Sequence, residues 1–171
     1  MDEPTLIERT AQPYVAIRTS VTMDRLGEAV PPLNGEVFAW LAERGIAPAG
    51  PPFWKYDVID MDRELVIEAG VATAEPVDAG QDPRVLSGTL PAGTYATVTH
   101  TGHPDELVAA TGALLDWGAA RGIVWDSAPG DDGEHWGARL ELYLTDPDDE
   151  PDMTKWRTEL AFRIAADSPR P

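Results

Sequence analysis

The chain contains two close copies of one seven-residue string, and this internal repeat constrains the fold more than any other feature. The string is WLAERGI at residues 40–46 and WGAARGI at residues 117–123, so the copies lie 117 − 40 = 77 residues apart. That offset is nearly half of the 171 residues. Repetition at this spacing indicates that one supersecondary unit is used twice within a single domain, which we expect to span residues 1–171.

The segments around the two copies repeat as well. Alternation of β-branched with smaller residues predicts a strand before each helical stretch, at PYVAIRTSV and TYATVTHTG. The helical stretches carry apolar residues at three- and four-residue spacing and close on Gly45 and Gly122, a residue type suited to the left-handed end of a helix. Two further strands are expected after each helix, at residues 53–60 and 64–73 and at residues 136–145 and 156–165.

Each half therefore has the order β-α-β-β, with one module at about residues 12–75 and the other at about residues 85–166. Two such modules joined in pseudo-symmetry predict an α+β fold. In this fold one concave antiparallel sheet carries both helices on its convex face, and the opposite face stays free. The first strand is expected to begin near Pro13, and no DNA-binding segment is expected before it.

Details of the helices differ between the halves. Pro31 and Pro32 should divide the first helix into two pieces, and Asn34 is placed to cap the second piece through its side-chain oxygen. Trp40 and Trp117, the aromatic residues of the repeated string, are expected to pack in the core.

Composition and charge exclude several classes of protein. The formal net charge of −17 would repel a phosphate backbone and argues against nucleic-acid binding. Much of the acidity lies in DSAPGDDGEH and LTDPDDEPD, which read as loops. No apolar run is long enough to span a bilayer and no signal peptide begins the chain, so we expect a cytoplasmic protein with no membrane partner. The absence of Cys excludes disulfides, thiol nucleophiles and thiolate-bound zinc.

Residue alternation along RLELYLT (residues 139–145) divides its side chains between two faces. Leu140, Leu142 and Leu144 are suited to packing under the helices, which leaves Glu141 and Tyr143 on the opposite face together with Arg139. We expect that free face to carry the function. The alternative is that Glu141 is a surface carboxylate paired with Arg139 or Arg163.

Three segments resemble the GyrI-like effector-binding domains, found alone and as ligand sensors of multidrug-responsive transcription activators. These are GPPFWKYDVID (residues 50–60), LPAGTYATVTHTG (residues 90–102) and RLELYLTDP (residues 139–147), in that order, and the resemblance covers nearly the whole chain. It implies two β-α-β-β modules around a cavity for planar, apolar, often cationic compounds. One departure is HTGHP at residues 100–104, where relatives often read HTGPY, so an aromatic residue is missing at the start of that helix.

The resemblance also implies roles for individual residues. Glu141 matches the acidic group at the pocket floor and Tyr143 its aromatic neighbour, while Trp54 and Tyr56 fall at the rim or wall. With Trp136 and Arg139, these residues form the expected ligand-binding set. Burial raises the pKa of a carboxyl group unless a partner compensates, and a bound cation would compensate. Facing aromatic rings would add about 0.5 to 2 kcal/mol of cation–π attraction.

Two further functions stay open. As the resemblance implies, some relatives hydrolyse cyclopropane-bearing DNA alkylators. In such an enzyme Glu141 would be the general base on water, and Tyr143, Tyr56 or Trp54 would stabilise the departing negative charge. Nothing in composition or spacing separates hydrolysis from binding. The third function is engagement of another protein through the acidic surface, as the family's association with DNA gyrase inhibition implies. The sequence predicts no oligomeric state.

Metals and cofactors are not expected. His100 and His103 straddle a strand-to-helix junction and His135 lies in an acidic segment, so the three histidines lack the spacing of a metal site. The motifs GxSxG, GxGxxG and GxxxxGK[ST] are absent, which argues against a serine hydrolase and against nucleotide cofactors.

Overall fold

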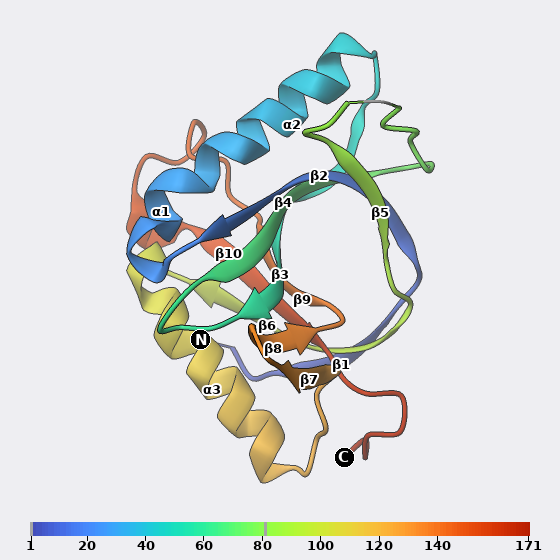
Figure 1. The fold of residues 1–171 in the computed structure, drawn as a ribbon. Coiled ribbons are helices and arrows are strands. Elements are labelled where there is room, and N and C mark those ends of the chain that lie inside the picture. The colour runs from blue at the N-terminus through green and yellow to red at the C-terminus, as the bar shows by residue number, and fades with distance from the viewer. Residues whose placement is uncertain (1, 81) are drawn as a thin grey trace.

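A computed structural model describes residues 2–80 and 82–171 and has an α+β fold, as predicted. Antiparallel strands form one sheet that curls into a half-barrel (Figure 1). The sheet order is β1-β6-β10-β9-β3-β4-β2-β5, and the hairpin β7–β8 attaches to β3. The strands are β1 (Thr5–Arg9), β2 (Gln12–Val21), β3 (Pro48–Ile59), β4 (Leu65–Thr73), β5 (Leu86–Leu90), β6 (Gly93–Thr101), β7 (Ser127–Gly130), β8 (Gly133–Trp136), β9 (Arg139–Tyr143) and β10 (Arg157–Arg163).

The order of strands is symmetric about the pair β3 and β9. On either side of that centre, β4 corresponds to β10, β2 to β6, and β5 to β1. The outer strands are exchanged, because β1 pairs with β6 of the second repeat and β5 pairs with β2 of the first. Two sequence predictions are wrong here. The first strand begins at Thr5 instead of near Pro13, and the acidic segment expected to be a loop forms the hairpin β7–β8.

The helices are α1 (Leu26–Ala29), α2 (Pro31–Glu43) and α3 (Leu107–Ala120), with short 3-10 turns η1 (Met23–Arg25), η2 (Pro104–Glu106) and η3 (Met153–Lys155). The predicted break before α2 is confirmed, because Pro31 and Pro32 occupy its first positions. Asn34 does not cap the helix. It lies within the first turn of α2, and its side-chain amide donates to the backbone carbonyls of Phe53 and Gly70 at 3.3 and 3.2 Å.

The repeated string makes the same helix end twice. Arg44 donates to the carbonyl of Trp40 and covers its ring at 3.8 Å, and Arg121 does the same for Trp117 at 4.5 Å. Gly45 and Gly122 then adopt φ of 67° and 70°, the left-handed conformation predicted for them. Each following Ile amide donates back to the helix at 3.0 Å, which completes a Schellman motif. The repeat is thus structural, and both tryptophans pack on core clusters.

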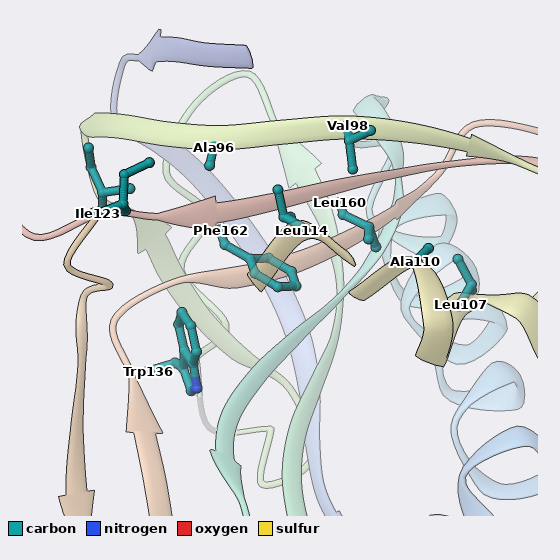
Figure 2. Packing of buried hydrophobic residues seen from close by; sticks show 10 residues of the cluster. Ala96, Val98, Leu107, Ala110, Leu114, Ile123, Trp136, Leu160 and Phe162 are labelled. Carbon is teal, nitrogen blue, oxygen red and sulfur yellow. The ribbon is translucent and has the colours of Figure 1, made fainter. Parts of the chain in front are cut away.

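Helices α2 and α3 cover the convex face of the sheet (Figure 1). Under α3, Figure 2 shows Leu107, Ala110 and Leu114 facing residues of β6 and β10, with Phe162 at the centre. On the concave face, a second cluster joins side chains of strands that are distant in the sheet, such as Tyr14 of β2 and Tyr95 of β6. That contact across the half-barrel identifies the inner face.

The sequence assigned the two faces of β9 the wrong way round. Leu140 and Leu142 do not lie under the helices, because they belong to the concave cluster with Phe53 and Tyr14. Arg139, Glu141 and Tyr143 therefore point to the helix-bearing face. Among the residues described, no helix is long and apolar enough to cross a membrane.

Candidate functional site

A cavity of about 1240 Å³ lies on the helix-bearing face, between α1–α2 on one side and η2–α3 on the other. Strands β3 and β9, at the centre of the pseudo-symmetry, form its floor. The floor residues are Trp54, Tyr56, Arg139, Glu141 and Tyr143. The two helical walls contribute mainly apolar side chains, among them Leu26, Phe38, Leu107 and Val108.

Glu141 is the buried carboxylate of this floor and is only 7% exposed. Its Oε1 accepts hydrogen bonds from two tyrosine hydroxyls, Tyr56 at 2.8 Å and Tyr143 at 2.7 Å. The second oxygen, Oε2, accepts no hydrogen bond from the residues that the structure describes. One oxygen is therefore fixed by the protein, and the other is left for a molecule in the cavity.

The register of the central strands explains this convergence. Trp54 pairs with Glu141 across β3 and β9, with Phe53 opposite Leu142 on one side and Lys55 opposite Leu140 on the other. A local two-fold axis through that pair relates each residue to the one at the same offset on the other strand. It therefore relates Trp54 to Glu141, and Tyr56 to Tyr143. The two hydroxyls that hold Glu141 thus come from equivalent places in the two repeats.

Burial raises the pKa of Glu141, although the hydroxyls of Tyr143 and Tyr56 and the charge of Arg139 partly oppose the change. The same burial, together with the nearby carboxylate, raises the pKa of both tyrosines well above the ordinary value. Both hydroxyls therefore keep their protons at neutral pH and act as donors. Ionisation of Glu141 in this buried place has an energetic cost, which a cation near Oε2 would reduce.

Arg139 lies beside Glu141 on the same face of β9. Its guanidinium carbon is 4.7 Å from the ring centroid of Phe162, 4.9 Å from that of Trp136 and 5.9 Å from that of Tyr56. Burial lowers the pKa of Arg139, and the charge of Glu141 is among the groups that oppose this. The aromatic cage fixes the guanidinium next to the carboxylate.

Trp54 completes the aromatic part of the floor. Its ring meets that of Tyr143 edge to face, with centroids 5.1 Å apart. Its indole N–H donates to the side-chain oxygen of Asn34 at 2.7 Å, and the amide of Asn34 in turn bonds the backbone of β3 and β4. Asn34 thus joins α2, the sheet and the cavity wall through a fully used side-chain amide.

The structure brings together five of the six residues expected to bind a ligand. Trp136 is the exception: it does not line the cavity, but packs with Phe162 in the core under α3 (Figure 2). Its ring centroid lies 4.9 Å from the guanidinium carbon of Arg139. The alternative of an exposed Glu141 paired with an arginine is wrong, since Arg163 pairs with Asp126 at 2.8 Å.

The helical walls and rim were missed by the sequence reasoning. Leu107 and Thr111 of α3 both line the cavity, and helical spacing alone gave neither a ligand-binding role. Exposed apolar side chains mark the opening once the structure is known. Val108, Met61 and Leu144 are 65%, 56% and 41% exposed, and all three line the cavity. At the departure from the expected HTGPY motif, His103 lines the cavity and caps η2 by accepting from the Asp105 amide.

Solved structures share this fold at low sequence identity. The C-terminal domain of EcmrR is 20% identical with a TM-score of 0.74, and the match covers 95% of this chain and 97% of that domain. The chain spans 57% of the EcmrR chain seen in a DNA complex, at 21% identity and a TM-score of 0.73. SAV2435 bound to tetraphenylphosphonium is 11% identical with a TM-score of 0.61, and 96% of this chain and 95% of that one are covered.

A hydrolase from Listeria innocua is 14% identical with a TM-score of 0.65, over 95% of this chain and 92% of that one. A comparison with curated protein sequences gave no significant match. The family model of the GyrI-like small molecule binding domain matches residues 2–165, nearly the whole chain. The protein therefore belongs to the GyrI-like small molecule binding domain family.

Proposed function

We propose that this chain binds planar, hydrophobic, often cationic small molecules of the multidrug type in the cavity between its helices. The observation that carries the proposal is the hydrogen bonding of Glu141: two tyrosines hold one oxygen, and the other has no partner among the residues that the structure describes. A cation beside Oε2 would offset the cost of the buried charge. The rings of Trp54 and Tyr143 would add contact area and cation–π attraction.

The opening of the cavity supports the same function. Exposed apolar groups cost free energy in water, so the exposed cavity-lining residues Met61, Val108 and Leu144 favour molecules that cover them. A related structure, SAV2435, was solved with tetraphenylphosphonium, a bulky lipophilic cation. Neither apolar contact nor charge attraction is strongly directional, and a site built on them accepts ligands of varied shape.

Binding is tested by titrating the protein with the cationic dye rhodamine 6G and following fluorescence anisotropy. Glu141→Gln should weaken binding at least tenfold, because it removes the charge and keeps the side-chain volume. Glu68→Gln is the matched control, since Glu68 is equally buried but lies on the concave face with Tyr14, and its affinity should stay within about twofold of the wild type. Equal affinities of the wild type and Glu141→Gln for the dye would show that Glu141 takes no part in binding.

Hydrolysis of cyclopropane-containing DNA alkylators is the second candidate, and Glu141 again carries it. A buried carboxylate whose pKa is raised, with one free oxygen facing a cavity, fits a general base acting on water. In the reaction, water adds to a cyclopropane carbon, the strained C–C bond breaks, and its electron pair passes to the conjugated carbonyl oxygen. Glu141 takes the proton from water, and a proton from Tyr143 or solvent neutralises the oxygen.

Turnover separates the two candidates. Substoichiometric protein is incubated with a spirocyclopropane-type alkylating agent, and free, bound and hydrated compound are followed by mass spectrometry. Several turnovers that vanish in Glu141→Gln would establish hydrolysis. Intact compound recovered in a one-to-one complex would establish binding alone.

A further inference from the structure

Arg139 is a cavity residue whose guanidinium lies among aromatic rings. Among the residues that the structure describes, no carboxylate lies within ion-pair distance of its guanidinium, and no hydrogen bond engages its N–H groups. Buried arginine is ordinarily paired, because removing a guanidinium from water is costly. Here the rings of Tyr56, Trp136 and Phe162 lie around it. The charges of Glu141 and Glu134 act on it from beyond ion-pair distance.

Those aromatic contacts place the guanidinium carbon 4.7 to 5.9 Å from the three ring centroids, and none of them supplies an oxygen or nitrogen acceptor for its N–H groups. Because none of these nitrogens is fully enclosed, and Arg139 lines the cavity, the donors have access to the space above the floor. Tyr56 joins the two charges of the floor, since its ring contacts Arg139 and its hydroxyl bonds Glu141.

The floor therefore carries two ionisable groups available to a ligand, the carboxyl group of Glu141 and the guanidinium of Arg139. Residues 139 and 141 point to the same face, and two steps along a strand separate them by roughly 7 Å. The free oxygen of Glu141 accepts hydrogen bonds, and the free edge of Arg139 donates them. A ligand with a single positive charge would satisfy the first group and leave the second without an acceptor.

We propose that Arg139 is a specificity-determining residue of the cavity, which selects aromatic ligands carrying an anionic or carbonyl oxygen in addition to a cationic or donor group. The inference rests on the proposed binding function and names its ligand class. A carboxylate or phenolate oxygen can take two parallel N–H bonds from the guanidinium, the geometry in which arginine binds oxygen anions best. Zwitterionic dyes should bind better than the corresponding plain cations.

Rhodamine B and its ethyl ester test this preference, because they share one cationic aromatic body and differ in a free carboxylate. Affinities for both dyes are measured by fluorescence anisotropy at pH 7.5. The wild type should bind rhodamine B at least tenfold more tightly than the ester. In Arg139→Met that ratio should fall to about one or below. Arg84→Met is the matched control, since Arg84 pairs with Glu36 at 2.8 Å on the surface and does not line the cavity, and its ratio should stay within about twofold of the wild type.

Arg139→Lys covers the case in which Arg139→Met does not fold, since it keeps the charge and the apolar stem but not the planar pair of donors. Its ratio should lie between those of the wild type and Arg139→Met, at least threefold below the wild type. An unchanged ratio in every folded Arg139 variant, or a wild type that prefers the ester, would overturn the assignment. Failure of both dyes to bind would instead refute the proposed function on which it rests.

Discussion

The two buried glutamates should respond to pH in opposite directions, and Glu141 is the informative one. Burial raises its pKa, so the protonated form is favoured in the folded state. Its contribution to stability is fully present below the unfolded pKa of about 4.3 and is lost as pH rises through the folded pKa. Glu141→Gln cannot ionise but keeps the volume and can still accept both tyrosine hydrogen bonds. It should therefore become more stable than the wild type as pH rises.

The magnitude follows from what compensates the charge. Two hydroxyls and the nearby guanidinium offset part of the cost of burying the carboxylate, and one oxygen has no partner. An incompletely satisfied buried polar group costs about 1 to 3 kcal/mol. We expect Glu141→Gln to match the wild type near pH 4 and to exceed its free energy of unfolding by about 1 to 3 kcal/mol at pH 8.

Glu68, on the concave face, should show the opposite pH dependence of stability. Burial alone would raise its pKa, but the neighbouring Asp57 carboxyl group, the charge of Lys55 and the hydroxyl of Tyr14 together lower it. Its contribution is present above the unfolded pKa and is lost as pH falls through the folded pKa. Glu68→Gln should thus be less stable than the wild type at pH 8, with a smaller difference near pH 4.

Urea unfolding followed by tryptophan fluorescence measures these differences at pH 4, 6 and 8, and an unchanged m-value shows that only stability has moved. Comparing variants with the wild type at each pH cancels the effect of the overall charge of −17. A Glu141→Gln variant that loses stability at pH 8 as Glu68→Gln does would refute the reasoning. In that case Glu141 would be a stabilising structural carboxylate and not a strained one.

Three further perturbations test the scaffold. Gly118→Ala places a Cβ 2.3 Å from the ring of Trp125 and should cost about 1 to 3 kcal/mol in thermal unfolding, whereas Gly112→Ala in the same helix meets open space and should gain up to about 1 kcal/mol; equal effects would contradict the packing. Asn34→Ala removes the bonds between α2 and the sheet and should cost about 1 to 3 kcal/mol in urea unfolding, and a neutral result would show that they contribute nothing. Removal of residues 2–10 exposes the edge of β6 and should lower the melting temperature and raise light scattering. An unchanged melting temperature with unchanged light scattering would contradict this.

The duplicated fold could be predicted from the sequence because its signals are local. The helix ends depend on Arg44, Gly45 and their equivalents, which act within one turn of the chain. The outer strands could not be predicted in the same way. Strand β1 pairs with β6, some 90 residues later, and its short, half-polar segment gains its partner only when both repeats are folded.

The candidate site shows a sharper limit. Alternation correctly separated Glu141 and Tyr143 from Leu140 and Leu142, but alternation does not say which side is covered. The apolar pair seemed suited to the helices, yet it fills the inside of the half-barrel, where the curl brings distant strands together. The polar residues lie on the helix side because α2 and α3 stand apart and leave a cavity over the central strands.

The pseudo-symmetry explains why the floor carries a single carboxylate. Equivalent positions on β3 and β9 lie directly opposite each other at the axis, so a duplicated Glu would place two buried carboxylates side by side, where both cannot ionise. In this chain one position is Glu141 and its equivalent is Trp54, while the tyrosines at the next equivalent positions are both retained and both donate to the same oxygen. Duplication thus supplies two identical donors, and divergence at one pair supplies one charge with an aromatic wall beside it. Exchanging the pair, by Trp54→Glu with Glu141→Trp, should preserve the two hydroxyl bonds at the new carboxylate and leave Arg139 without its neighbouring charge. Retained affinity for rhodamine 6G in that double variant, with an unchanged preference for rhodamine B over its ester, would show that the carboxylate and the guanidinium act separately; loss of the preference would show that they act as one unit.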